Sequence, residues 1–194
     1  MTMMSKFTEV KYMLCLLAVL IVGCTNNYFP KPYGYFRVDL PEQNYIRIDT
    51  ILPYAFDISD LAYVDLKQQQ HEKNWMDIVY PDLNATIHCS YKPLNANFSE
   101  LSEDAHRSVF KHSMKADDIN TSIFKNQANQ VYGVYYDLKG NVASVAQFVL
   151  TDSINHFFRG AVYFDHVPNK DSIAPMADYI KNDVIRFMES FSWK

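Results

Sequence analysis

The sequence VYGVYYDLKGNVASVAQFVLTDSINHFFRGAVYFD, at residues 131–165, contains three β-rich runs separated by two short turns. The runs span residues 131–138, 142–151 and 154–165, and the turns are Lys139-Gly140-Asn141 and Asp152-Ser153. Turns this short join strands that lie next to each other and run in opposite directions. The stretch therefore predicts a three-stranded antiparallel meander.

The strands of this meander are apolar on both faces, which predicts a sheet that is covered on both sides. The second run shows this most clearly, since Val145, Phe148, Val149 and Leu150 cannot all point the same way. One cover is a helix predicted over residues 173–191, with Ser172 as its N-cap and Pro175 in its first turn. Its apolar residues recur at spacings of three and four: Ile173, Ala177, Ile180, Val184, Phe187, Met188 and Phe191.

A second helix is predicted over residues 98–116, where Asn97 and Glu100 have the spacing of a capping box. Its apolar stripe should face the sheet and consists of Phe98, Leu101, Ala105, Val109, His112 and Ala116. Phe110 and Met114 lie on the opposite side of this helix. They are therefore candidate contact residues for a partner, although single exposed apolar side chains are common.

Four more strands are predicted upstream, at residues 45–49, 54–58, 75–80 and 85–91. The last two should form a hairpin through the turn at residues 81–84, and residues 66–73 are expected to be a polar loop. The fold class is therefore α+β, an antiparallel sheet covered by two helices in a single domain over residues 45–194.

The N-terminal residues indicate a lipoprotein leader. The uncharged run at residues 12–22 is too short to span a bilayer and ends in Leu20-Ile21-Val22-Gly23-Cys24. This is the pattern cut by the lipoprotein signal peptidase, so residues 1–23 are expected to be removed and Cys24 to be acylated with palmitate-like chains. The alternative is an ordinary secretory leader, or a buried helix, with a cysteine at this position by chance.

Charge and cysteine content follow from this cleavage. Loss of Lys6, Lys11 and Glu9 leaves 16 basic and 21 acidic residues, a net charge near −5, which argues against nucleic acid as a partner. Membrane attachment would come from the acyl chains on Cys24. Cys89 is then the one remaining thiol, so no intramolecular disulfide can form and the core alone must stabilise the domain.

Residues 24–44 combine prolines with aromatic residues and favour an extended course over a helix. Candidate contact residues here, on the domain itself or on a partner, are Tyr28, Phe29, Tyr33, Tyr35, Phe36 and Arg37. The alternative is a passive linker. No acidic residue follows Cys24 closely, so we expect the outer membrane, facing the periplasm, with the inner membrane as the alternative.

No familiar catalytic or phosphate-binding motif occurs in the sequence, and we expect no cofactor. His88-Cys89-Ser90 places a thiol beside an imidazole, but neighbours on a strand point to opposite faces, so Cys89 is expected to be a buried apolar residue. Glu103 and His106 share a helical face and supply at most half of a metal site. Arg159 should form a buried ion pair, with Asp137 as the expected partner, or else bind the carboxylate of a peptide or cell-wall ligand.

Several stretches together resemble the GldD family of gliding motility lipoproteins from the Bacteroidetes. They are YFPKPYGYFR at 28–37, SYKP at 90–93, EDAH at 103–106, KHSMKAD at 111–117, GNVAS at 140–144, FVLTDS at 148–153, RGA at 159–161 and PNKDSIAP at 168–175. The resemblance implies a component needed for gliding and tied to the type IX secretion system, with other envelope proteins as partners, and it implies no known reaction.

The order of elements also looks like the PsbP-like fold, an analogy of topology from which no function follows. The leading hypothesis is a non-enzymatic lipoprotein that scaffolds or stabilises the gliding and secretion apparatus. The alternatives are a periplasmic module that binds a peptide or glycan, and an uncharacterised hydrolase.

Overall fold

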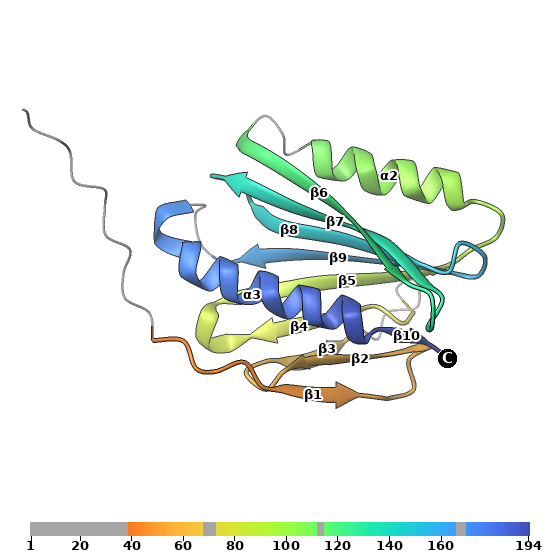
Figure 1. Ribbon diagram of the computed structural model, residues 1–194, viewed down its shortest axis with the longest axis horizontal. Coiled ribbons are helices and arrows are strands. Elements are labelled where there is room, and N and C mark those ends of the chain that lie inside the picture. Colours follow the sequence, from red (N-terminus) through yellow and green to blue (C-terminus); the bar gives the residue numbers. More distant parts are fainter. Residues whose placement is uncertain (1–38, 68–72, 112–114, 166–169) are drawn as a thin grey trace, which may run out of the picture. The chain divides into compact units, whose positions relative to one another are not determined.

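The computed structural model describes residues 39–67, 73–111, 115–165 and 170–194, which belong to one compact unit (Figure 1). Its largest element is a seven-stranded antiparallel sheet in the order β3-β4-β5-β9-β8-β7-β6. The strands are β3 Tyr63–Leu66, β4 Met76–Tyr80, β5 Ala85–Pro93, β6 Ala116–Asn126, β7 Val131–Gly140, β8 Ser144–Thr151 and β9 His156–Phe164. The predicted meander is confirmed as β7-β8-β9.

The predicted hairpin is also confirmed and consists of β4 and β5. Its turn is a short 3₁₀ helix, Pro81–Leu83, followed by Asn84 in the left-handed conformation at φ 47°. Asparagine tolerates this backbone better than most residues, which explains its place in the turn. Strand β5 then pairs with β9 along its whole length, from Ala85 opposite Phe164 to Pro93 opposite His156. This pairing joins the N-terminal half of the domain to the meander.

The two helices cover opposite faces of this sheet, as the sequence predicts. Helix α2, Phe98–Phe110, packs through Leu101 and Ala105 onto Phe157, while the next residue, Phe158, points into the main core beneath α3, Lys170–Ser190. Consecutive strand residues face opposite sides, so the two phenylalanines identify an α2 face and an α3 face. Figure 1 shows α2 above the meander and α3 across the sheet.

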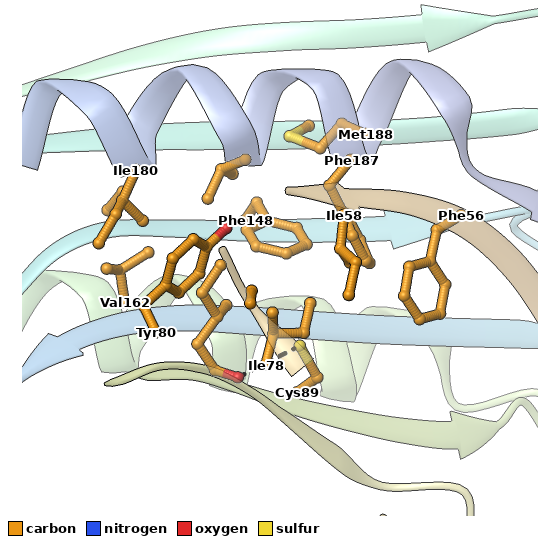
Figure 2. Close-up of a cluster of buried hydrophobic side chains, with 14 of the residues drawn as sticks. Phe56, Ile58, Ile78, Tyr80, Cys89, Phe148, Val162, Ile180, Phe187 and Met188 are labelled. Atoms are coloured by element: carbon orange, nitrogen blue, oxygen red, sulfur yellow. Dashed lines mark hydrogen bonds between the residues drawn. The ribbon is translucent and has the colours of Figure 1, made fainter. Parts of the chain in front are cut away.

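The main core lies between α3, the α3 face of the large sheet and a small second sheet (Figure 2). The second sheet has the order β1-β2-β10, with β1 Tyr45–Ile48, β2 Tyr54–Ser59 and β10 Ser192–Trp193. Phe187 of α3 contacts Phe56 of β2 at 4.8 Å and Phe148 of β8 at 5.4 Å between ring centroids. Phe191, directly after α3, stacks on Tyr54 at 5.4 Å. The end of α3 therefore connects the two sheets.

Three strands escape the sequence prediction. Strand β3 ends at Leu66, the first residue of the predicted polar loop, and the sequence predicts no strand directly before that loop. Strand β10 is too short to give a periodic signal. Strand β6 begins at Ala116, which the sequence places in the first helix, because that helix ends at Phe110. Most β6 side chains are exposed at the edge of the sheet, so β6 has no buried stripe.

Both predicted helix caps also need correction. The side chain of Asn97 does not cap α2 but accepts a hydrogen bond from the backbone N–H of Asn95 at 2.9 Å. Helix α3 begins at Lys170, two residues before the expected cap Ser172. His112 lies outside the described residues, so its place on the apolar stripe stays a prediction. The apolar stripe of α3 is confirmed, since all seven of its predicted members are buried.

One carboxylate is buried within this core. Asp183 on α3 is 3% exposed and accepts hydrogen bonds from Gln43 Nε2, Tyr45 Oη and Tyr80 Oη at 3.0–3.1 Å. It thereby joins β1 and β4 to the helix. Burial raises the pKa of Asp183 to about 6, against the stabilising effect of these donors on the charged form.

The raised pKa of Asp183 predicts that stability falls as the pH rises. Below about pH 4 the carboxyl is protonated in both the folded and unfolded states, and between pH 4 and 6 only the unfolded state releases the proton. We expect this group to lower the free energy of unfolding by about 2–3 kcal/mol across that window, and Asp183→Asn to abolish this contribution. Urea denaturation of both proteins at several pH values measures the difference, and parallel pH profiles would contradict the assignment.

Gly160 on β9 is required by close packing rather than by backbone conformation. A Cβ at this position would lie 2.2 Å from Cζ of Phe148, the residue directly opposite on β8. The ring of Phe148 covers the glycine and fills the core beneath α3 (Figure 2).

We therefore expect Gly160→Ala to lower the free energy of unfolding by about 1–3 kcal/mol through overpacking. Phe148→Leu removes the obstructing ring, so the double variant should lose less than the sum of the two single variants. Denaturant melts of the four proteins give this coupling energy. Additive losses would show that the ring does not determine the need for glycine.

Candidate functional site

The α2 face of the large sheet carries polar side chains where the α3 face is apolar. Cross-strand pairing places Asp77 opposite His88 and Ser90 opposite Arg159. These residues line an open groove of about 440 Å³, the Arg159 groove, with Lys67, Trp75 and Tyr163. Strands β3, β4, β5 and β9 thus position the site, on a part of the face next to α2.

Asp77 organises one side of the groove. It is 8% exposed, and its two oxygens contact Lys67 Nζ at 2.7 Å and His88 Nδ1 at 2.9 Å. The hydrogen bond to Asp77 raises the pKa of Lys67. Sequence reasoning missed this carboxylate, although a charged residue inside the apolar run MDIVY was a signal. Each carboxylate oxygen of Asp77 is engaged by one of these neighbours.

Arg159 forms the other side and departs from the prediction. The expected ion pair with Asp137 is wrong, because Asp137 points to the α3 face, where Lys181 Nζ lies 2.6 Å away. Arg159 instead donates from Nη2 to Ser108 Oγ of α2 at 2.6 Å and to Gln147 Oε1 at 2.9 Å. Burial lowers the pKa of Arg159, yet the guanidinium stays charged.

Cys89 takes no part in this groove's chemistry. Its side chain is buried on the α3 face, and its Sγ lies 3.7 Å from the carbonyl oxygen of Ile87 (Figure 2). Burial raises the thiol pKa well above its usual value. His88, half-exposed on the other face, is directed to Asp77. The predicted separation of thiol and imidazole is confirmed, which rules out a Cys89–His88 nucleophilic pair.

A second surface lies on the outer side of α2 and is aromatic. Phe110 and Phe98 are 41% and 38% exposed. The ring of His106 is tilted against Phe110 at 4.4 Å and meets Tyr136 edge-on at 6.3 Å between ring centroids. These four residues, which together form the α2 surface, border an open depression of about 770 Å³. The predicted exposure of Phe110 is confirmed, whereas Phe98, which the sequence places on the stripe that faces the sheet, is exposed instead.

Metal binding gains no support from the α2 surface. His106, which the sequence pairs with Glu103, is engaged with aromatic rings. Within the described ranges, no three His, Cys, Asp or Glu side chains gather as they would around a metal ion.

Several predicted site residues lie outside the described residues. They are the lipidation site Cys24 and the candidate contact residues Tyr28, Phe29, Tyr33, Tyr35, Phe36, Arg37 and Met114. Their roles remain predictions.

A comparison with known protein families identifies the family of this chain. The family model described as gliding motility lipoprotein GldD matches residues 25–193. The chain belongs to the GldD family. GldD proteins are gliding motility lipoproteins, which places this chain in the cell envelope on a lipid anchor. Within the described part of the chain, no helix is long and apolar enough to cross a membrane.

Curated proteins and solved structures give two further comparisons. The search of curated proteins finds no match. Among solved structures, the chain is similar to the solution structure of cyanobacterial PsbP (CyanoP) from Synechocystis sp. PCC 6803, with a TM-score of 0.45 and 11% sequence identity. The similarity covers 81% of this chain and 97% of CyanoP. The similarity to CyanoP assigns no role to any residue of the GldD chain. The α+β architecture is evident from the sheets and helices described above.

Proposed function

We propose that this GldD-family chain is a non-enzymatic component or stabiliser of the gliding and type IX secretion machinery, anchored in the outer membrane and facing the periplasm. The observation that carries the proposal is the family match over residues 25–193, which begins directly after Cys24. Acyl chains on Cys24 would hold the domain at the membrane, since two or more chains together give stable attachment.

The α2 surface supports a role in protein contacts. Phe98 and Phe110 expose aromatic rings on a helix whose other side is already buried against the sheet. Aromatic side chains with a polar neighbour such as His106 are typical of the centres of protein interfaces. The aromatic residues of the segment 28–37 are the second proposed contact, as they would emerge between the anchor and the domain.

The geometry also favours binding over catalysis. Asp77 and His88 have the contact of an acid–base pair, but Lys67 shares the same carboxylate, and the neighbouring thiol faces the opposite side of the sheet. A hydrolase of the familiar kind needs a nucleophile within hydrogen-bond reach of the imidazole. The described contacts of His88 supply no such group.

The first test of the proposal is the lipid anchor. Cys24→Ser should abolish acylation and release or mislocalise the protein, because the leader alone gives no lasting attachment. Cys15→Ser, within the same leader, is the matched control and should leave anchoring unchanged. Metabolic labelling with a clickable fatty acid and membrane fractionation measure both. A Cys24→Ser protein that stayed acylated and kept full motility would contradict the anchor, and digestion by protease added to intact cells would contradict the periplasmic orientation.

The second test addresses the α2 surface. Phe98→Ser with Phe110→Ser should lower the free energy of unfolding by about 1–2 kcal/mol per ring, since each ring is more than half covered, while spreading of cells on agar is lost. Ile51→Ser is the matched control, since Ile51 is 92% exposed and lies between β1 and β2 of the small sheet. Normal spreading by the double variant, at normal protein levels, would remove the α2 surface from the proposal.

A further inference from the structure

Arg159 holds hydrogen-bond donors that the described residues do not use. Among the described residues, both of its hydrogen bonds leave from Nη2, although a guanidinium carries five N–H groups, three of them on Nη1 and Nε. Both acceptors, Ser108 Oγ and Gln147 Oε1, are neutral. Gln147 is itself buried, and its Nε2 has no hydrogen-bond partner within the described chain. A half-buried cation is thus left with incomplete partners.

The acidic residues around the groove are engaged elsewhere. Asp77 is held by Lys67 and His88, Asp65 shares Lys67 at 3.6 Å, and Asp104 of α2 lies 3.5 Å from Arg107. Removing a charge from water is costly unless an opposite charge or a full set of hydrogen bonds replaces the water. Among the described residues Arg159 has neither, which leaves its charge available to an anion that enters the groove.

The charges of the groove define that anion. Lys67 contacts the carboxylates of both Asp77, at 2.7 Å, and Asp65, at 3.6 Å, so among the residues that line the groove Arg159 is the cation without a described carboxylate contact. A single carboxylate balances this charge and matches the two-pronged geometry of a guanidinium. A phosphate monoester would add a second negative charge close to Asp77.

The walls of the groove define the rest of the ligand. Trp75 and Tyr163 offer ring surface, while Ser90, opposite Arg159, offers a hydroxyl that can both donate and accept. The volume of about 440 Å³ falls within the range of small-ligand sites. Amide groups beside the carboxylate would satisfy this mixed lining, whereas a fatty acyl chain would bury the polar side formed by Lys67, Asp77 and His88.

We propose that the Arg159 groove binds the free C-terminal carboxylate of a short peptide, with Nη1 and Nε of Arg159 as the fork that holds it. Ser90 lies beside this fork and contacts the ligand, while Ser108 and Gln147 orient the guanidinium from the opposite side. Such a site gives this envelope lipoprotein a ligand in addition to its protein contacts.

The test uses the acylated full protein in detergent, with acetyl-trialanine as the free acid and as its C-terminal amide. Titration calorimetry should show saturable binding of the acid and at least tenfold weaker binding of the amide. Two-dimensional NMR should show the shift at the Nε–H of Arg159 and the indole N–H of Trp75. Equal affinity for acid and amide, or no saturable binding of the acid, would overturn the proposal, and this comparison needs no variant that might unfold.

Variants separate ligand binding from structural support. Arg159→Gln should abolish binding of the acid, and Arg159→Lys should weaken it at least fivefold, because an ammonium keeps the charge but loses the fork. Lys111→Gln removes one charge at the end of α2, outside the groove lining, and should bind normally. Unchanged binding by Arg159→Gln would refute the site. Inorganic phosphate that competes as well as the peptide acid would show a general anion site and overturn the peptide assignment.

Discussion

The packing of Phe187 and Phe191 between the two sheets is the interaction on which the rest of the structure depends. These rings contact Tyr54 and Phe56 of the small sheet and Phe148 and Phe158 of the large one. Each fully buried ring contributes about 1.5–3 kcal/mol, so a few of them are comparable with the whole stability of a domain. Cys89 is the one thiol among the described residues, and no disulfide shares this task there.

Because the α3 face of the large sheet packs the main core, the α2 face is the one available for function. Helix α2 packs on Phe157 of β9 and borders β5, where Ser90 lines a cavity with Leu101 of the helix. The α3 face is mainly apolar and packs the core, whereas Asp77, His88 and Arg159 on the α2 face make specific polar contacts. The Arg159 groove sits where the cover ends, with a helix on one side and an open, rigid sheet below it, an arrangement that holds a ligand-binding side chain in place.

The sequence predicts those elements whose own periodicity is strong. The meander has clear turns, and the α3 stripe repeats at three and four residues over its length, so both are recovered. Strand β6 is lost because its exposed side chains carry no stripe, and β3 and β10 because they are short. The site depends on which residues of neighbouring strands lie opposite each other. The alternation of side chains within one strand carries no information about this register. For that reason the sequence assigns Arg159 to Asp137, on the wrong face, and misses the Asp77–His88 contact.

Two cations on opposite sides of the large sheet show why Arg159 points to a ligand. On the α3 face, Lys181 of helix α3 is mostly buried and has the carboxylate of Asp137 at 2.6 Å. On the α2 face, Arg159 is half-buried with two neutral acceptors, both on one nitrogen. The structure therefore supplies a carboxylate to Lys181 beside the packed core, whereas the described residues supply none to Arg159 beside the open groove. If Arg159 had only a structural role, a glutamate in place of Gln147 would balance its charge better. Glutamate has nearly the same size and shape as glutamine. The neutral amide keeps the guanidinium oriented while leaving its charge available.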